Sequence, residues 1–437
     1  MQHAFMKAAV AALVGVTMLA PVAFAQDLTE TPVPKYRLPG TAPEPDRTKR
    51  QTGLTERTFN LLTSIFEDLG EERYAEARDR LTELGNTRRL SEYEEASIHR
   101  YLGFTHAMLE DTDAAIREMN IALQAEALSH SETQETMLQV AQLYAQEENW
   151  RGVLQMMPRY LYWEADPKPS ALMLMTYAYV QQEDFRQTIV WGERWLEAEG
   201  EPKENALQIL LWANFELKQY DEAADILAQL IANWPDKVDY WEQLAGVLMS
   251  LEREDDSLAV YSVAYQKGLL KTEAKIKNLV SYYLYREAPF NAARVLARGM
   301  ESGVIKPTRE NWELLSQAYQ MAQENELAIG ALQKAAALSD DGELFVREAQ
   351  LHAAVDNWEG VQRAAEHAVE KGGLENPGRA WMMIGMAAYE RGENAAALRA
   401  LREAAKHADS KRNAEQWINY INNQIRAARE LRQGMSG

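Results

Sequence analysis

The sequence contains no cysteine in 437 residues. Disulfide bonds, thiol nucleophiles, cysteine-based zinc sites and a lipid-modified N-terminal cysteine are therefore all excluded. Basic residues are scarce: 46 Lys and Arg stand against 66 Asp and Glu, which gives a net charge of −20. Such a charge disfavours binding to nucleic acid and to anionic membranes and favours basic partners, although it also simply keeps a long chain in solution.

Motifs that would indicate catalysis are also missing. The histidines lie in no His-Glu-x-x-His arrangement, and neither a phosphate-binding G-x-x-x-x-G-K-[ST] loop nor a G-x-S-x-G elbow occurs. His99 and His106 could share one helix face, but such pairs are more often packing or surface residues than ligands. The sequence therefore predicts no catalytic residue, no cofactor and no metal site, and we expect that the protein is not an enzyme.

The first 25 residues have the pattern of a secretion signal. Lys7 supplies a positive charge, residues 8–20 form a short apolar run, and Ala23-Phe24-Ala25 is a small-residue cleavage site before Gln26. The apolar run is too short for a stable membrane span, and the rest of the chain contains no apolar run that is longer. We therefore expect cleavage near Ala25 and Gln26, a periplasmic location, and no membrane span in the mature chain.

Residues 26–52 differ from the rest in composition. They contain five prolines and few apolar residues, and basic side chains gather near their end, at Arg47, Lys49 and Arg50. This composition predicts an extended, flexible linker of about 20 residues. It fits a plain spacer after the signal, and it also fits a flexible arm for a partner.

From residue 53 onward one pattern recurs ten times, at intervals of 33 to 38 residues. Each copy has a residue, here called the anchor, in the middle of an apolar helical segment. The anchors are Ile65, Gly103, Ala141, Thr176, Leu211, Ala245, Ser281, Ser316, Ala349 and Gly385. Nine residues later, six copies have an aromatic residue, at Tyr74, Trp150, Phe185, Tyr220, Phe290 and Trp358. This spacing is typical of tetratricopeptide repeats, which are pairs of antiparallel helices.

The repeats predict the fold class. Alanine occurs three residues further on in five of the copies, where two helices must pack closely, at Ala77, Ala115, Ala223, Ala293 and Ala328. One helix pair cannot bury its apolar stripe alone, so stacked pairs form a continuous core. We therefore predict an all-α superhelical solenoid of about ten helix pairs over residues 53–412. Residues 413–437, with apolar side chains at helical spacing, are predicted to form a C-terminal capping helix and tail.

A solenoid of this kind binds partners along the face of its first helices. Positions one and four residues after each anchor are expected to face the groove there. The candidate partner-binding residues are Gln142, Tyr177, Trp212, Tyr282, Tyr285, Arg286, Gln317, Gln320 and Tyr389. Aromatic and amide side chains of this kind can hold an extended peptide by stacking and hydrogen bonds. The alternative is that several of them pack against the next repeat, and for Trp212 and Tyr282 the two interpretations are equally favoured.

Several longer segments resemble a known family. They are KRQT (49–52), PKEN (202–205), YWEQLAG (240–246), AYQKGLL (264–270), ENWELL (310–315), ALSDDGEL (337–344), KGGL (371–374) and PGRAW (377–381). In these segments the chain resembles the periplasmic tetratricopeptide-repeat protein associated with TonB energy-transduction systems. The resemblance covers roughly residues 49–422 and is densest from residue 200 onward.

This resemblance implies a protein-protein interaction scaffold that supports energy-dependent uptake of iron–siderophore complexes across the outer membrane. The implied partners are TonB, ExbB or ExbD components, or an outer-membrane protein, and the family has no catalytic residues to carry over. A proline- and lysine-rich segment of a TonB-type partner would complement the acidic charge of the chain. Two alternatives stay open, namely a general cell-envelope assembly scaffold and an enzyme with a hidden polar site.

Overall fold

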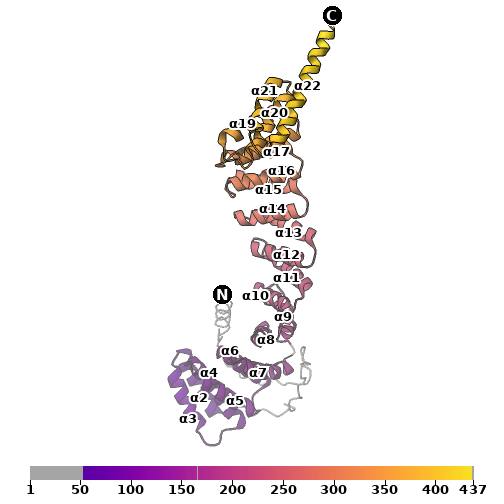
Figure 1. Ribbon diagram of the computed structural model, residues 1–437. Helices are drawn as coiled ribbons and strands as arrows, with labels where there is room; N and C mark the ends of the chain where they lie inside the picture. The colour runs from indigo at the N-terminus through magenta and orange to yellow at the C-terminus, as the bar shows by residue number, and fades with distance from the viewer. Residues whose placement is uncertain (1–52, 165, 436–437) are drawn as a thin grey trace. The chain divides into compact units, whose positions relative to one another are not determined.

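The structure, a computed structural model, describes residues 53–164 and 166–435. The predicted signal segment 1–25 and the linker 26–52 therefore lie outside the described residues. Within the described part every regular element is an α-helix, and the helices follow one another in antiparallel pairs (Figure 1), which confirms the predicted all-α tetratricopeptide-repeat class. The chain divides at Asn233 and Trp234 into two compact units, and each unit is described by itself.

The first unit contains five helix pairs, in which each helix packs against the next one along the chain. The helices are α2 (Glu56–Gly70), α3 (Tyr74–Gly85), α4 (Glu92–Met108), α5 (Thr112–Gln124), α6 (His130–Gln146), α7 (Trp150–Trp163), α8 (Pro169–Gln181), α9 (Phe185–Glu199), α10 (Glu204–Glu216) and α11 (Tyr220–Asn233). Its largest apolar core contains the rings of Trp191 and Trp195, both almost completely buried. Core packing between successive pairs is what stabilises the stack.

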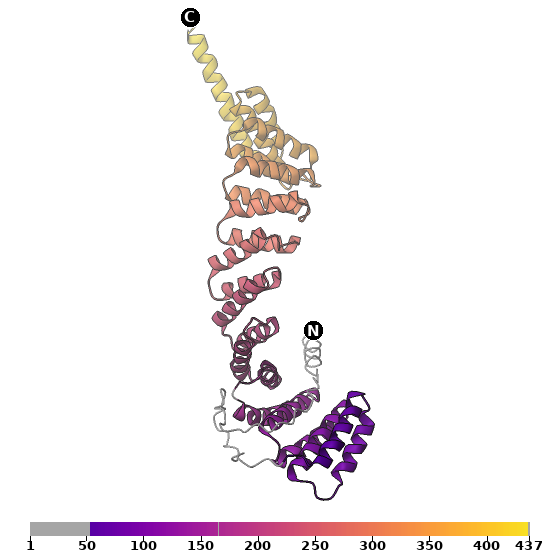
Figure 2. The same cartoon turned by 180° about the vertical axis from the view of Figure 1, so that it is seen from behind.

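The second unit contains five further pairs and a single final helix, again with each helix packed on its successor, and Figure 2 shows these pairs from behind. The helices are α12 (Val238–Ser250), α13 (Glu254–Gln266), α14 (Glu273–Tyr285), α15 (Pro289–Glu301), α16 (Arg309–Met321), α17 (Asn325–Ala337), α18 (Glu343–Ala354), α19 (Trp358–Lys371), α20 (Pro377–Glu390), α21 (Asn394–Ala404) and α22 (Lys411–Met435). Whether residues 53–412 form one continuous array stays a prediction.

The nine-residue spacing from anchor to second helix holds in both units. Second helices begin at Tyr74, Trp150, Phe185, Tyr220 and Trp358, as the sequence predicts. The seventh repeat is displaced by one residue: α15 begins at Pro289 instead of Phe290, and the buried anchor is Val280 instead of the exposed Ser281. The reason is that proline suits the first position of a helix, where its fixed φ fits and its missing N–H is not needed.

The predicted close contacts between paired helices are present. Ala77, Ala115, Ala223 and Ala328 are fully buried, and Ala293 is buried beside Ala292, which holds the equivalent position in the shifted repeat. At the anchor Gly103, an added Cβ would lie 2.4 Å from Cγ of Met119 and 3.0 Å from the carbonyl oxygen of Ala115. Only a hydrogen atom fits there. Glycine therefore lets the two helices of that repeat, α4 and α5, approach each other more closely than any other residue would allow.

The turn inside every helix pair has one backbone conformation. Seven residues after the anchor, φ is positive at Glu72, Glu110, Glu148, Glu183, Lys218, Glu252, Glu287, Gln323, Asp356 and Gly392. The N–H of the next residue then donates to the carbonyl five residues earlier, as from Arg253 to Leu248 at 2.8 Å. This hydrogen bond closes a Schellman motif that ends the first helix. Nine of the ten repeats use a residue with a side chain at a position that favours glycine.

Candidate functional site

The nine candidate partner-binding residues are divided between the two units. Gln142 of α6, Tyr177 of α8 and Trp212 of α10 belong to the first unit. Tyr282 and Tyr285 of α14, Arg286 directly after it, Gln317 and Gln320 of α16, and Tyr389 of α20 belong to the second unit. Six of the nine therefore lie in the second unit.

In the first unit, Tyr177 is a correction to the sequence prediction. Its side chain is 5% exposed, and its ring centroid lies 6.2 Å from that of the buried Trp195. Burial also raises the pKa of the Tyr177 hydroxyl. A ring enclosed in this way has no face to offer a partner, so Tyr177 is a core residue.

Gln142 and Trp212 are both half-buried. The indole of Trp212 meets the ring of Phe185 edge to face, with centroids 4.8 Å apart. This contact joins the start of α9 to α10, so part of the Trp212 ring is used in packing between neighbouring helices. The first unit therefore offers only isolated partly exposed side chains at the predicted positions.

In the second unit, the register of α14 changes which side chains face outward. With Val280 as the anchor, the outward positions are Ser281 and Leu284, and Tyr285 follows one residue later. Tyr282 instead turns toward α13, the second helix of the preceding pair, where its ring meets that of Tyr261 edge to face at 5.5 Å. Tyr282 is therefore mainly a packing residue, whereas Tyr285 is 63% exposed.

Equivalent positions on four successive first helices form what we name the first-helix stripe. It consists of the residues one, four and five positions after each anchor of α12, α14, α16 and α18. The members are Gly246, Met249, Ser250, Ser281, Leu284, Tyr285, Gln317, Gln320, Met321, Gln350, Ala353 and Ala354. Each of them is exposed or half-buried, and none carries an acidic or basic side chain. The stripe is therefore an uncharged, partly apolar surface in a strongly acidic chain.

The stripe combines apolar rings or chains with amides. Tyr285 and Met321 are 63% and 58% exposed, and they hold the same position in consecutive repeats. Gln317 is exposed, and Nε2 of Gln320 donates to Oγ of Ser316 at 3.2 Å, which leaves its amide oxygen as an acceptor. Such a surface can pack against side chains of an extended peptide and pair with its backbone groups.

Ion pairs beside the stripe hold neighbouring repeats together. Nζ of Lys275 on α14 lies 2.7 Å from the carboxylate of Glu242 on α12, and Nη1 of Arg347 on α18 lies 2.9 Å from that of Glu313 on α16. Each pair joins first helices that are one repeat apart. Glu242 and Glu313 lie one helical turn before Gly246 and Gln317, so these charges border the stripe on the side of the helix N-termini.

Arg286, a predicted partner residue, is already paired within the chain. Its Nη2 lies 2.6 Å from the carboxylate of Asp255 and its Nη1 lies 3.6 Å from that of Glu254. The hydrogen bond from Arg286 to Asp255 raises the pKa of the guanidinium. This side chain therefore fixes the end of α14 against the first turn of α13, where acidic residues also suit the helix dipole.

Tyr389 of α20 lies at an outward position that α22 covers. Its ring meets those of Trp417 and Tyr420 edge to face, at 5.7 and 6.0 Å. Ile421 of α22 is fully buried and follows the last anchor, Gly385, by one repeat length. Helix α22 thus occupies the place of an eleventh first helix, as expected for a cap, and it ends the run of open first helices.

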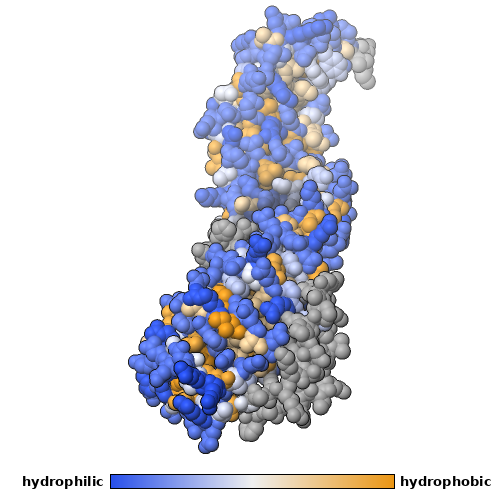
Figure 3. All heavy atoms as spheres, turned by 90° about the horizontal axis from the view of Figure 1, so that it is seen from below, coloured by the Kyte–Doolittle hydropathy of each residue, from blue (hydrophilic) through white to orange (hydrophobic). Residues whose placement is uncertain are grey.

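Two general properties of the described residues limit the kind of site. Within 53–164 and 166–435, every helix is too short or too polar to cross a bilayer. In the same part of the chain, no three His, Asp or Glu side chains gather in a group suited to a metal ion. Most of the surface in Figure 3 is hydrophilic, with apolar side chains in small groups between the polar ones.

Sequence reasoning missed part of the stripe. Met321 lies on it five positions after its anchor, outside the two positions expected to face the groove, whereas Met249 and Gln350 lie at those positions but are not among the candidate residues. The periodicity already contained the signal, because position five lies next to positions one and four on a helix face. Including it would have identified Met321 beside Tyr285.

No family model matches the chain, and no curated protein does. Among solved structures, MamA is similar at 19% identity with a TM-score of 0.29, over 39% of this chain and 97% of MamA. A tetratricopeptide repeat protein from Parabacteroides merdae is 12% identical, with a TM-score of 0.28, over 58% and 98%. YrrB, described as a TPR protein with an unusual peptide-binding site, is 18% identical, with a TM-score of 0.29, over 42% and 93%. At these scores the likenesses carry no argument about function.

Proposed function

We propose that the protein is an interaction scaffold that binds an extended segment of a partner protein along the first-helix stripe. The observation that carries this proposal is the uncharged, partly apolar surface on four successive first helices. Repeat solenoids use such stacked surfaces for binding, because equivalent side chains recur at a regular spacing. The acidic charge of the rest of the chain would attract a basic segment, while the stripe would hold it at short range.

We further propose that the scaffold works in the periplasm as an accessory component of a TonB-ExbB-ExbD system. The sequence resemblance over roughly residues 49–422 and the signal pattern in the first 25 residues support this assignment. A proline- and lysine-rich segment of a TonB-type partner has the chemistry that the acidic chain and its stripe would accept. The proposed role is support for uptake of iron–siderophore complexes across the outer membrane.

A pull-down from native envelopes tests both levels of this proposal. The bait is the chain from residue 26 to 437, and the bound proteins are identified by mass spectrometry. A variant with Tyr285→Ala, Gln317→Ala and Met321→Ala removes the centre of the stripe. The control is Leu338→Ala, because Leu338 is 55% exposed and caps a second helix instead of a first one.

We expect TonB, ExbB or ExbD to be recovered with the unchanged chain and with the control, and to be lost with the stripe variant. Recovery of outer-membrane assembly or cell-wall factors without those three would replace the TonB assignment with a general envelope-assembly scaffold. Equal recovery by the stripe variant would contradict the proposed binding surface whichever partner is found.

A further inference from the structure

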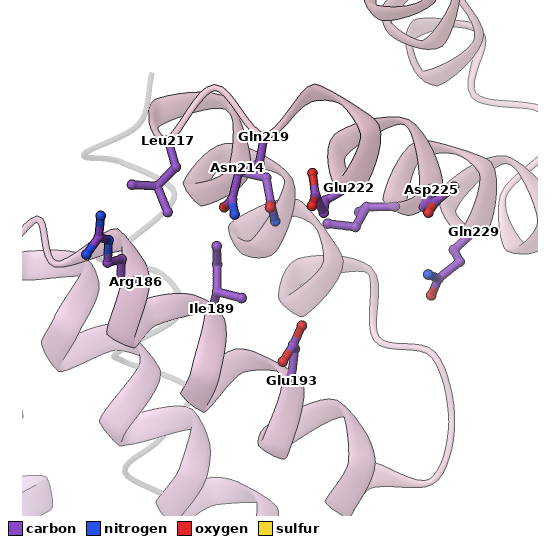
Figure 4. A pocket seen from close by; sticks show the side chains of 10 residues that line it. Arg186, Ile189, Glu193, Asn214, Leu217, Gln219, Glu222, Asp225 and Gln229 are labelled. Atoms are coloured by element: carbon purple, nitrogen blue, oxygen red, sulfur yellow. The ribbon is translucent and has the colours of Figure 1, made fainter.

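A cleft of about 660 Å³ lies between α9 and α11 in the first unit, where both helices meet the end of α10. Figure 4 shows its lining side chains. Ile189, Leu217 and Ile226 give it an apolar component, and they come from three successive segments of the chain. This α9–α11 cleft is large enough for one or two side chains of a bound segment. Most of its lining comes from second helices, and it lies in the first unit, whereas the first-helix stripe lies in the second.

Carboxylates dominate the polar part of the α9–α11 cleft. Glu193 comes from α9, and Glu222 and Asp225 come from the first half of α11. Within the described part of the chain, none of the three forms an ion pair. Arg186 is the only basic residue among the lining side chains, and Figure 4 shows it at one edge of the cleft. The cleft therefore presents unneutralised negative charge beside apolar surface.

Asn214 supplies an unused acceptor in the same place. Its side chain is 4% exposed and lines the cleft, and its Nδ2 donates to the carbonyl oxygen of Leu210 at 2.8 Å. No described residue donates a hydrogen bond to its Oδ1. The amide oxygen can therefore accept a hydrogen bond from a ligand that brings N–H groups.

The repeat fold itself does not demand these acidic side chains. In the second unit, the region between α13 and α15 has residues at the same repeat positions: Arg294 replaces Asp225, Arg298 replaces Gln229, and Ser262 replaces Glu193. That region encloses only about 60 Å³, because the hydroxyls of Tyr283 and Ser262 hydrogen bond across it at 2.9 Å. The open, acidic form is therefore a property of this repeat and not of the architecture.

We propose that the α9–α11 cleft binds a lysine- or arginine-bearing extended segment of a partner protein. The ammonium or guanidinium group pairs with Glu193, Glu222 and Asp225 and donates to Oδ1 of Asn214. Its methylene groups pack on Ile189 and Ile226, since long basic side chains keep their stems on apolar surface. This inference does not depend on the proposed function, because it concerns another unit and another helix face.

The test measures binding of a fluorescein-labelled octapeptide of alternating lysine and alanine to the chain from residue 26 to 437, by fluorescence anisotropy at low salt. The cleft variant carries Glu193→Gln, Glu222→Gln and Asp225→Asn. The control variant carries Glu67→Gln, Glu76→Gln and Glu83→Gln, three exposed acidic residues on α2 and α3 of the same unit. Both variants change the net charge equally. The control therefore measures how much of any weakening comes from the overall negative charge of the chain.

We expect the cleft variant to bind the lysine peptide about tenfold more weakly than the unchanged chain, and the control to bind within about twofold of it. Added salt should weaken binding to the unchanged chain more than to the cleft variant. Equal weakening by both variants would show general attraction only and overturn the proposal. Binding of a glutamate–alanine octapeptide with the same affinity would overturn it too, as would no binding of the lysine peptide.

Discussion

The ring of Tyr389 lies edge to face against Trp417, with centroids 5.7 Å apart and ring planes at 66°. This contact attaches α22 to α20, although 28 residues separate the two side chains in the sequence. It closes the outward face of the last complete helix pair, whose apolar stripe would otherwise be open to water. The final helix is therefore part of the folded unit and also marks where the accessible first helices end.

Replacing Trp417 should weaken the cap. Trp417→Ala removes a half-buried indole that contacts Tyr389 and Tyr420, and we expect the free energy of unfolding of the second unit to fall by about 2–3 kcal/mol. Urea denaturation followed by circular dichroism measures the change. Arg426→Ala, at an exposed position of the same helix, serves as the control. Equal effects of the two substitutions would show that the indole contact does not hold the cap.

Replacing Gly392 and Gly246 by alanine should change the free energy of unfolding in opposite directions. Gly392→Ala places a side chain at φ +79°, so we expect a loss of about 1 kcal/mol in unfolding free energy. Gly246→Ala, inside α12 with open space around it, should add about 1 kcal/mol because alanine favours the helix. Urea denaturation distinguishes the two signs. A gain at Gly392 would mean that the turn does not constrain its backbone as the structure shows.

Glu94 should make stability depend on pH. Burial alone would raise the pKa of its carboxyl, but hydrogen bonds from the Ser91 backbone, Thr58 and Thr55 together lower the pKa from 4.5 to about 2. A depressed pKa gives stability that is complete above the ordinary value of 4.5 and is lost as pH falls toward 2. Between pH 5 and pH 3 the unchanged chain should therefore lose more unfolding free energy than Glu94→Gln.

The matched control for that titration is Glu95→Gln, at the exposed neighbouring position. Denaturation curves at the two pH values should change by the same amount in this control and in the unchanged chain. If Glu94→Gln kept the full loss of stability between pH 5 and pH 3, the hydrogen bonds that join α2 and α4 would not account for it.

Substitutions at Tyr177 and Tyr285 should have different effects, the first on the stability of the fold and the second on binding of the partner. Tyr177→Ala removes a buried ring beside Trp195, so we expect about 3 kcal/mol less unfolding free energy. Tyr285→Ala changes an exposed side chain, so stability should stay within about 0.5 kcal/mol while partner capture decreases. Thermal denaturation and the envelope pull-down measure the two effects. A stable Tyr177→Ala chain or a strongly destabilised Tyr285→Ala chain would reverse the assignment of these two rings.

The fold could be predicted from the sequence because the same pattern of residues recurs from one repeat to the next. Each anchor, each second-helix start and each buried small residue recurs at fixed offsets, so one clear copy such as that around Leu211 and Tyr220 informs the others. The seventh repeat is predicted one residue late because Phe290 fits the aromatic position nine residues after Ser281. The proline at position 289 was the better marker, since it fixes the helix start directly.

The candidate site was only partly predictable, because exposure depends on the neighbouring helix. Tyr177 and Trp212 hold the same offset from their anchors, yet Tyr177 is enclosed by Trp195 and Trp212 is half-exposed. Tyr389 is covered by α22, a contact that the offset rule does not contain. The α9–α11 cleft has no sequence motif at all, since its residues come from three elements with ordinary helical spacing.

Site-specific photo-crosslinking in native cells tests directly whether a partner protein binds along the first-helix stripe. A benzophenone side chain would replace Tyr285 on the first-helix stripe in one variant and Leu338 on the second-helix side in another. Binding along the first-helix stripe predicts a crosslinked envelope protein, expected to be TonB or one of its motor partners, at position 285 and not at position 338. No product at position 285, or the same product at both positions, would contradict binding through the stripe.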